Sequence, residues 1–448
     1  MQYFTPFLKE PTRETAVERC IEQLLQLYEN NGFPFVNISL HNVILSEKNN
    51  SLHCSVLVNI EEGPLVYLEE YHLKGNTSTK TEVIMRELRM KSGELYVQKN
   101  VEKIPKRLQH LDLFSAVSEP ELLITENGGA LHIAVQERKF TTFDGVVGYV
   151  PSSGERKRFV AGFINVSSNN LFGTGRKTIV RWQRDDAFSQ EIFLSYMEPW
   201  IMNVPLNVTG SFFQRKQDSL FVRRIFEVKT AVFLTDEFTA NVHVSQENII
   251  ASNMLTSVHS SDAMFLGAEI LYDARDNIFF TTDGEKISVQ FYEGKKNVER
   301  HSRAYLQRFF ADGELYRSLA ANHIIATTFH SREVQSKKLE GTDLFQFGGA
   351  TTLRGYREKQ FLGSRIVWTT AEYRFLFSPQ AYAFVFFDAA YFSRPATNFA
   401  TSAEQFLYGY GFGMRLETAL GFVGVSFALG KGDAFSQTKM HLQLINSF

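Results

Sequence analysis

The sequence predicts an all-β, membrane-spanning barrel of about sixteen antiparallel strands, preceded by small α+β repeats. Three observations carry this prediction. Helical periodicity is confined to the chain before residue 139, and beyond it stretches of about ten residues alternate apolar and polar side chains. Phe and Tyr are abundant, with 41 and 17 copies in 448 residues, as in barrels with aromatic belts. No run of about 18 apolar residues provides a transmembrane helix.

Length, charge and cysteine content narrow the class further. A chain of 448 residues is long enough for two or three domains. The 47 basic and 49 acidic residues nearly balance, which argues against nucleic acid as a partner. Cys20 and Cys54 have no neighbouring His or Cys cluster, so free thiols are favoured over zinc ligands, and a disulfide stays open. The first residues lack the charged start and apolar stretch of a secretory signal, so an exported protein would be represented here by a mature or truncated chain.

The first N-terminal unit has the order helix, strand, strand. Apolar residues at helical spacing predict a helix over residues 13–31, which ends at Asn31-Gly32. Two alternating stretches near 35–45 and 52–61 predict strands, and Asn49-Asn50 marks the turn between them.

The second unit repeats this ending after an additional strand and helix. A strand is expected near 65–73, followed by a capping box at Thr79-Lys80-Thr81-Glu82 that opens a helix reaching Met90. Another helix near 97–111 is expected to bend or begin at Pro105. Strands near 116–123 and 130–136 complete the unit.

The shared order indicates a repeat of about 70 residues whose first copy lacks its front part. Through its segments 71–76, 112–117 and 135–138, the second copy resembles the polypeptide-transport-associated (POTRA) repeats, the periplasmic modules of bacterial outer-membrane insertion proteins. A generic small α+β domain is the alternative. We expect a truncated repeat over 1–62, a complete repeat over 63–138 and an outer-membrane β-barrel over 139–448.

Several strands of the barrel region have one apolar and one polar or small face. In 264–273, Met264, Leu266 and Ile270 alternate with Gly267 and Glu269. The stretches 366–375 and 439–444 show the same period of two. Closing one sheet into a barrel removes exposed edges and satisfies every backbone polar group, as a lipid environment requires.

Four separated segments of the barrel region combine glycine with aromatic and polar or charged residues. They are 170–175, 272–277 with Asp283-Gly284, 353–356 and 409–418 with Gly421. In order and spacing they resemble the BamA/TamA-type outer-membrane insertion superfamily, which also includes two-partner secretion transporters. The resemblance identifies a mid-barrel motif in the second segment, although Ile278 stands where the family has Pro. Its residues are Tyr272, Asp273, Arg275, Asp276 and Asn277.

The third segment carries a single cation, Arg354, whose planar fork of donors suits a carboxylate. The resemblance implies that this loop, between the eleventh and twelfth strands, folds into the barrel lumen. By the strand pattern, Glu372 and Asp388 point inward on the following strands and are the expected partners of Arg354. We expect Arg354, Gly355 and Tyr356 to hold the loop against the barrel wall, and a purely stabilising role stays open.

The chain ends with an aromatic residue on an alternating strand. Leu442, Leu444 and Phe448 resemble the C-terminal recognition signal of outer-membrane barrels, although the glycine usual within that signal is missing.

The resemblance implies an assembly, insertion or translocation factor in the bacterial outer membrane, with its repeats in the periplasm. Clients would be captured by β-augmentation, the addition of a strand to an exposed sheet edge, at the repeats and at a seam between strands near 140–150 and 440–448. The expected partners are unfolded outer-membrane or secreted proteins, outer-membrane lipid and periplasmic chaperones or accessory subunits, but no nucleic acid. A transporter for one exported protein is the alternative.

No enzyme, cofactor or metal site is expected. The sequence lacks the phosphate-loop, HExxH and GxSxG motifs. Ser318 and His323 share a strand, but a lone pair without an orienting third group is weak evidence for catalysis. A passive porin is a further class, which the repeats and the glycine-rich loop argue against.

Overall fold

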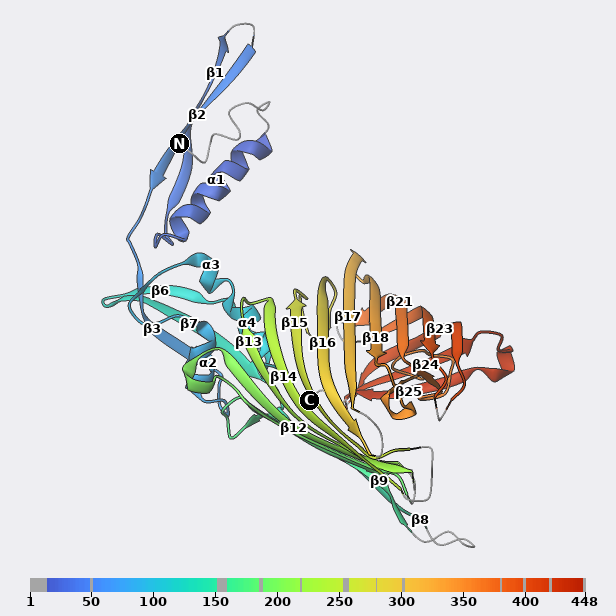
Figure 1. Cartoon of the computed structure of the whole chain (residues 1–448). Coiled ribbons are helices and arrows are strands. Elements are labelled where there is room, and N and C mark those ends of the chain that lie inside the picture. Colours follow the sequence, from blue (N-terminus) through green and yellow to red (C-terminus); the bar gives the residue numbers. More distant parts are fainter. Residues whose placement is uncertain are drawn as a thin grey trace. The chain divides into compact units, whose positions relative to one another are not determined.

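The computed structural model describes residues 14–48, 51–150, 159–184, 188–217, 220–252, 258–278, 280–299, 303–378, 381–397, 400–418 and 421–445. The chain divides into two compact units (Figure 1). The first comprises residues 1–138 with 172–174, and the second comprises 139–171 with 175–448. Within the described residues, no helix has the length and apolarity needed to cross a membrane.

The first unit begins with α1 (Glu14–Glu29), β1 (Asn37–Lys48) and β2 (Ser51–Glu61), the order that the sequence predicts. The two strands pair antiparallel over almost their whole length. Cys20 is a buried free thiol on the apolar side of α1, whereas the side chain of Cys54 lies outside the described part of the structure.

The segment 63–138, expected to be the complete repeat and here called the second repeat, has a mixed sheet in which β3 pairs parallel with the central strand β7. Strands β5 and β6 pair with the other side of β7, and β4 pairs with β3 only at Tyr67 and Leu68. Its core includes Leu68, Ile84 and Leu108, each fully buried. The elements are β3 (Tyr67–Lys74), α2 (Thr81–Leu88), β4 (Glu94–Leu95), α3 (Gln98–Val101), α4 (Ile104–His110), β5 (Phe114–Val117), β6 (Glu121–Thr125) and β7 (Gly128–Glu137).

Three local expectations in this repeat need correction or refinement. The strand expected over 116–123 is two strands, because Pro120 between β5 and β6 has no N–H to donate. The expected capping box is wrong, since the N-cap residue of α2 is Lys80 and its side chain makes no capping hydrogen bond. The helix expected over 97–111 is divided into α3 and α4, and α4 has Pro105 in its first turn.

A carboxylate supplies the interactions that the capping box was expected to provide. Glu137 accepts hydrogen bonds from the backbone N–H of Thr79 at 2.6 Å and of Ser78 at 3.0 Å, and from the Thr77 hydroxyl at 2.8 Å. Burial raises the pKa of Glu137, but these hydrogen bonds outweigh burial and hold its pKa below the ordinary value. The loop before α2 is therefore fixed by an ionised side chain at the end of β7.

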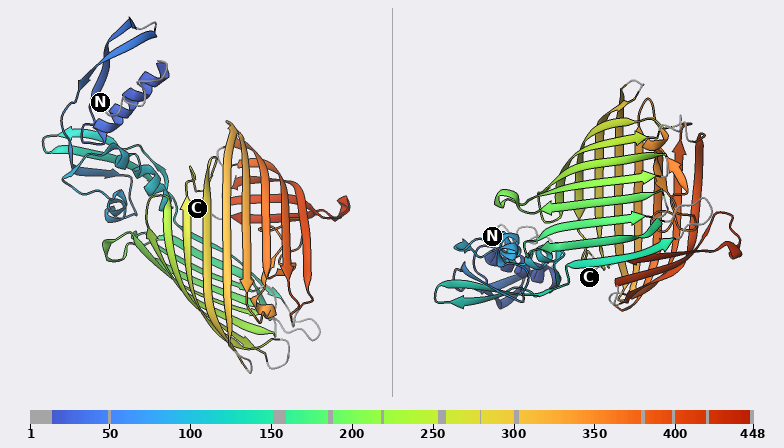
Figure 2. Two further views of the ribbon diagram at one scale, coloured as in Figure 1. Left: turned by 45° about the horizontal axis from the view of Figure 1, so that its top comes forward. Right: turned by 90° about the horizontal axis from the view of Figure 1, so that it is seen from below.

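The second unit is a single antiparallel sheet of sixteen strands, which confirms the predicted barrel architecture. Each strand pairs with its neighbour in sequence, and the sheet curves round on itself (Figure 2). The sheet order runs from β8 to β25, and among the described strands these two edges have no pairing with each other. The first eight strands are β8 (Thr141–Val150), β9 (Phe159–Leu171), β10 (Arg176–Arg184), β11 (Gln190–Glu198), β12 (Leu206–Gln217), β13 (Phe221–Phe233), β14 (Phe238–Ala251) and β15 (Ser261–Asp273). The other eight are β16 (Gly284–Val298), β17 (Ala304–Ala320), β18 (His323–Gln335), β21 (Arg365–Ser378), β22 (Ala381–Arg394), β23 (Ala403–Thr418), β24 (Gly421–Gly430) and β25 (Lys439–Ile445).

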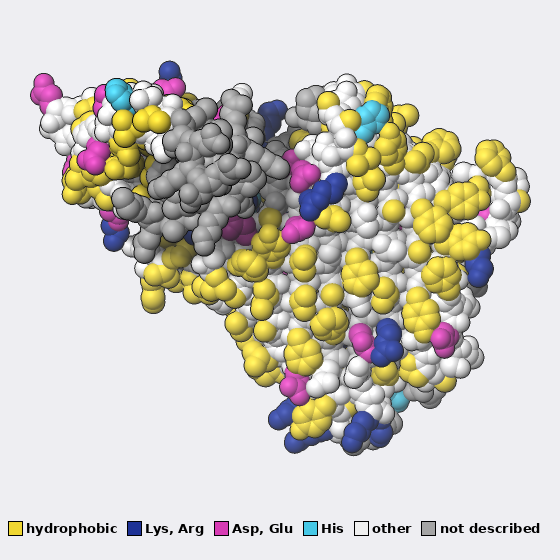
Figure 3. Space-filling view, turned by 90° about the horizontal axis from the view of Figure 1, so that it is seen from above, with side chains coloured by type: hydrophobic (Ala, Val, Ile, Leu, Met, Phe, Trp, Pro, Cys, Tyr) yellow, Lys and Arg dark blue, Asp and Glu magenta, His cyan; other side chains and the backbone are white. Residues whose placement is uncertain are grey.

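Alternation along the strands separates an apolar outer face from a polar inner face. In β15, Met264 and Leu266 are each 62% exposed, whereas Phe265 and Glu269 are buried. Figure 3 shows such hydrophobic side chains spread across one face of the molecule. Large apolar side chains that stay exposed along a whole sheet match a wall that faces lipid.

The connection between β18 and β21 contains its own short elements. They are the 3₁₀ turn η3 (Gly341–Asp343) and the paired strands β19 (Phe345–Phe347) and β20 (Phe361–Gly363). Two further 3₁₀ turns, η2 (Ile201–Asn203) and η4 (Phe435–Gln437), lie in other connections.

Candidate functional site

The connection between β18 and β21, here called the inserted loop (residues 336–364), packs on the inner face of the sheet. Its residues Phe347, Leu353 and Tyr356 form one buried cluster with inward side chains of the wall. The wall residues of this cluster are Ile366, Trp368, Ala390, Phe392 and Leu407. An apolar cluster between a loop and the inside of a barrel holds the loop there by burial.

Arg354 lies within the inserted loop, between β19 and β20, and contacts two carboxylates. Its Nε and Nη2 donate to the two oxygens of Asp388 at 2.8 and 2.7 Å, and its Nη1 donates to Oε1 of Glu372 at 2.7 Å. The backbone N–H of Arg354 also donates to Asp388, at 3.0 Å. The structure thus brings together the arginine and both acids that the sequence singled out, and the role of this contact stays a prediction.

The surroundings of Arg354 make this contact strong. The side chain of Asp388 is 1% exposed, and those of Arg354 and Glu372 are 10% exposed. The guanidinium carbon lies 3.5 Å from the ring centroid of Phe386, so an aromatic face covers the charge. Bidentate pairs with so little water around them are directional, and loss of one partner leaves a charge without compensation.

Gly355 and Tyr356 join the inserted loop to the last strands. The N–H of Gly355 donates to Nε2 of His441 in β25 at 3.1 Å. The Tyr356 hydroxyl donates to the carbonyl of Tyr408 in β23 at 3.1 Å and accepts from the N–H of Lys431 at 3.0 Å.

Glycines allow the backbone of the inserted loop to lie close to the backbones of β23 and β24. A Cβ at Gly409 would lie 2.0 Å from the carbonyl oxygen of Arg354, and one at Gly355 would lie 2.7 Å from the nitrogen of Gly430. Gly355 also has a positive φ of 89°, which side chains disfavour. The glycine-rich segment 409–413 therefore lets the loop backbone lie directly against the strand backbone.

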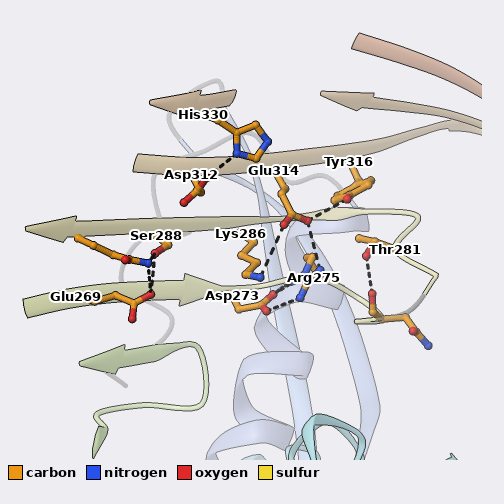
Figure 4. A network of polar contacts seen from close by, with 12 residues as sticks. Glu269, Asp273, Arg275, Thr281, Lys286, Ser288, Asp312, Glu314, Tyr316 and His330 are labelled. Atoms are coloured by element: carbon orange, nitrogen blue, oxygen red, sulfur yellow. Dashed lines mark hydrogen bonds and ion pairs between the residues drawn. The ribbon is translucent and has the colours of Figure 1, made fainter. Parts of the chain in front are cut away.

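The mid-barrel motif occupies the end of β15 and the turn after it. Arg275 donates from Nε and Nη2 to the two oxygens of Asp273 at 2.9 and 2.8 Å (Figure 4). Asp276 accepts from the backbone N–H of Thr282 at 3.0 Å, and the carbonyl of Asn277 accepts from the Thr281 hydroxyl at 2.7 Å. Tyr272 in β15 pairs with Phe238 in β14, and the centroids of the two rings are 4.7 Å apart. Among the residues that the structure describes, no hydrogen bond joins this motif directly to Arg354, Glu372 or Asp388.

Residues that the sequence did not single out lie between the two motifs. They are Glu314 and Tyr316 in β17 and Arg374 in β21. Each lies on the inward face of its strand, and an inward charge in an alternating strand was the available signal. The predicted pattern alone did not say which inward charges meet.

Other inward charges form separate clusters along the wall. Glu269 accepts from Lys229 at 2.9 Å and contacts His243 at 3.2 Å. Lys296, 3% exposed, donates to Asp343 of the inserted loop at 2.8 Å. Among the residues that the structure describes, no group of His, Cys, Asp and Glu could hold a metal ion.

Two further sequence candidates have other surroundings. The expectation that Ser318 and His323 share a strand is wrong, since Ser318 lies in β17 and His323 begins β18. The Ser318 hydroxyl donates to the carbonyl of Ala320, and His323 contacts the Tyr373 hydroxyl at 2.6 Å, so these two side chains do not face each other as a catalytic pair. Leu442 is 65% exposed on β25. The side chain of Leu444 and the whole of Phe448 lie outside the described residues.

Comparison with known proteins identifies the class. The Omp85 superfamily domain matches residues 170–444, and the surface antigen variable number repeat, a POTRA model, matches residues 66–138. Since the first match covers more than half of the chain, this protein belongs to the Omp85 superfamily.

Individual relatives agree with this assignment. The outer membrane protein assembly factor BamA of Neisseria meningitidis is 26% identical over 174 residues, which are 38% of this chain and 21% of that protein. BamA of Neorickettsia risticii is 32% identical over 117 residues, 26% of this chain and 15% of that protein. The chain thus matches only about a fifth of the length of these curated relatives.

Two solved structures share the fold. CdiB from Escherichia coli has a TM-score of 0.63 at 12% identity, covering 98% of this chain and 86% of its own. BamA from Haemophilus ducreyi lacking POTRA domains 1–3 has a TM-score of 0.54 at 15% identity, covering 97% and 93%.

Proposed function

We propose that this protein inserts or translocates β-rich client proteins at a bacterial outer membrane, with its repeats on the periplasmic side. The observation that carries the proposal is that the sheet ends in two edge strands, β8 and β25, which do not pair with each other among the described strands. The proposed seam lies between these two strands. Strand β25 pairs with β24 through seven residue pairs, from Phe422↔Ile445 to Ala428↔Lys439. An edge strand of this kind offers free backbone N–H and C=O groups to an incoming strand.

The second repeat supplies a second edge for the same chemistry. Among the described strands, β6 pairs only with β7, so its other side is available. Leu123 and Ile124 on β6 are 50% and 52% exposed, and they would add apolar contacts to main-chain hydrogen bonds. Pairing through the backbone demands no particular client sequence, which suits a protein with many unfolded clients.

Arg354 fits this function as the residue that fixes the inserted loop beside the seam. Its neighbour Gly355 contacts His441 in the edge strand β25. A loop held in place on one side of the seam keeps the last strands ordered while the edge stays open. Outer-membrane lipid and periplasmic chaperones or accessory subunits are the further partners that we propose for this function.

A cross-link at the seam tests the proposal. One cysteine in β8 and one in β25, in a Cys20→Ser, Cys54→Ser background, would be oxidised in lipid vesicles. We expect oxidation to slow the insertion of an unfolded client barrel and reduction to restore it. Unchanged insertion by the oxidised protein would overturn the seam mechanism. The single-cysteine variants are the matched controls for oxidation itself.

A transporter for one exported protein is the second candidate, favoured by the charged inner wall of the barrel. Clusters such as Glu269 with Lys229 and His243 give the lumen a polar lining that an extended chain could pass. In this case the oxidised seam would leave export intact, and fixing the inserted loop to the wall would stop it.

A further inference from the structure

The mid-barrel motif and the inserted loop are joined by a continuous series of side-chain contacts. The first step starts at the turn between β15 and β16. Arg275, already bound to Asp273, extends Nη1 to within 3.4 Å of Oε2 of Glu314 (Figure 4). Lys286 approaches the other oxygen of Glu314 at 3.8 Å. Glu314 is thus shared between cations from the turn and from β16.

The second step crosses from β17 to β21. The Tyr316 hydroxyl donates to Oε2 of Glu314 at 3.0 Å. The guanidinium carbon of Arg374 lies 5.5 Å from the Tyr316 ring centroid and 4.8 Å from that of Tyr382. A cation over two aromatic faces is held in orientation as well as in place.

The third step reaches the inserted loop. Arg374 donates from Nε and Nη2 to Oε2 of Glu372 at 2.9 and 2.7 Å. The other oxygen, Oε1, accepts from Arg354 at 2.7 Å. Glu372 therefore has one oxygen for each arginine, and its position depends on both.

The last step reaches the edge of the sheet. Residue Gly355, next to Arg354, donates its N–H to His441 in β25. Tyr356 binds the N–H of Lys431, in the connection that leads into β25. The series of contacts thus runs from the β15–β16 turn, in the middle of the sheet order, to the edge strand β25 at one end of it.

We propose that this series, here called the inner-wall relay, couples the β15–β16 turn to the order of the edge strand β25. Glu314, Tyr316 and Arg374 act as positioning residues, because in the described part of the chain none of them has a hydrogen bond, ion pair or ring contact with β25 or with the inserted loop. Each of the two relay carboxylates is shared between two cations: Glu314 between Arg275 and Lys286, and Glu372 between Arg374 and Arg354. If one cation moves away, the carboxylate shifts toward the other cation and changes that contact. The relay comprises Arg275, Glu314, Tyr316, Arg374, Glu372 and Arg354.

The inference goes beyond the proposed function, since it concerns which internal part of the barrel controls the edge and needs no client. Binding that displaces the β15–β16 turn would loosen the edge strand β25. Binding that stabilises the turn would order β25. Coupling of this kind is carried by discrete charged and packed contacts and requires direct measurement.

Hydrogen–deuterium exchange of the folded full-length chain in lipid vesicles, without client, tests the relay. In Glu314→Gln, we expect the amides of β25 to exchange about 2- to 30-fold faster than in the wild type. Exchange in β11 and β12, which lie outside the relay, should stay unchanged. The matched control is Glu333→Gln, since Glu333 binds Arg365 at 2.6 Å and takes no part in the relay.

A second variant separates the relay from a general loss of stability. Tyr316→Phe removes only the hydroxyl that binds Glu314 and keeps the ring beneath Arg374. It should fold like the wild type, as judged by its shift on unheated gels, and still speed exchange in β25. Faster exchange confined to residues 274–283, with β25 unchanged in both variants, would overturn the coupling and leave the proposed client function untouched.

Discussion

Each unit of this protein contains a loop held by one charged side chain, but the partners of that charge differ. In the second repeat, the carboxylate of Glu137 is surrounded by backbone N–H groups and a hydroxyl. In the barrel, the guanidinium of Arg354 is surrounded by two carboxylates that are themselves buried. If the bound charge is removed, neutral hydrogen-bond donors lose only their hydrogen bonds, whereas a buried carboxylate is left as an uncompensated charge. The barrel loop should therefore be the more sensitive of the two.

The largest effect is expected for Arg354→Ala. Removing one partner of a buried ion pair destabilises by about 3–5 kcal/mol, because the buried carboxylate of Asp388 loses its cation, whereas Glu372 keeps Arg374. The inserted loop should leave the inner face and become a protease target, measured by limited proteolysis in vesicles. Arg357→Ala is the control, since Arg357 is exposed in the same loop. Equal protease resistance in both variants would show that the apolar cluster alone holds the loop.

A smaller steric effect is expected for Gly409→Ala. The new Cβ would meet the carbonyl oxygen of Arg354 at 2.0 Å, so the loop or β23 must shift. Overpacking of this kind typically destabilises by about 1–3 kcal/mol. The loss of stability is measured as a lower midpoint temperature for the heat-induced shift of the folded protein on gels. Gly210→Ala is the control, because a Cβ there has no neighbour within 4 Å. Equal midpoints in the two variants would contradict the close approach.

In the repeat, Glu137→Gln is expected to destabilise the loop before α2 by about 1–2 kcal/mol, since a neutral amide accepts weaker hydrogen bonds. The amides of Ser78 and Thr79 should exchange faster, whereas Glu121→Gln on the exposed strand β6 should leave them unchanged. If both variants exchange like the wild type, the charge of Glu137 does not stabilise this loop.

The smallest effect is a pH dependence of the same loop. The folded-state pKa of Glu137 lies below the ordinary value of about 4.3. Its stabilisation is therefore complete above the unfolded-state pKa and is lost as pH falls through the lower folded-state pKa. Exchange of the Thr79 amide, corrected for its intrinsic pH dependence, should rise in this acidic window. Glu137→Gln should show no such rise, and a rise in both would point to another group.

The same comparison shows which parts of the molecule the sequence could predict. The strand number and the two-faced alternation follow from a period of two, which is local, and the structure confirms both. Arg354 and its two acids could be named from a motif and from the inward positions of neighbouring strands. Their contact is present, whereas its functional role stays a prediction.

Other features depend on information that is not local. Glu137 reaches a loop almost 60 residues earlier in the chain, so a capping box was the better local explanation of Thr79 to Glu82, and it is wrong. The inner-wall relay depends on the registers of β15, β16, β17 and β21 and on side-chain length. Alternation identifies Glu314 and Arg374 as inward but does not say that Tyr316 lies between them.

The direct backbone contact between the inserted loop and the glycines of the last strands has a consequence for the order of folding. The carbonyl of Arg354 lies against Gly409, and Gly355 lies against Gly430, with no room for a side chain between them. Gly409 and Gly430 face each other across the β23–β24 ladder, so the surface that receives the loop is formed by both strands together. The loop can therefore reach its final position only when these two strands are paired.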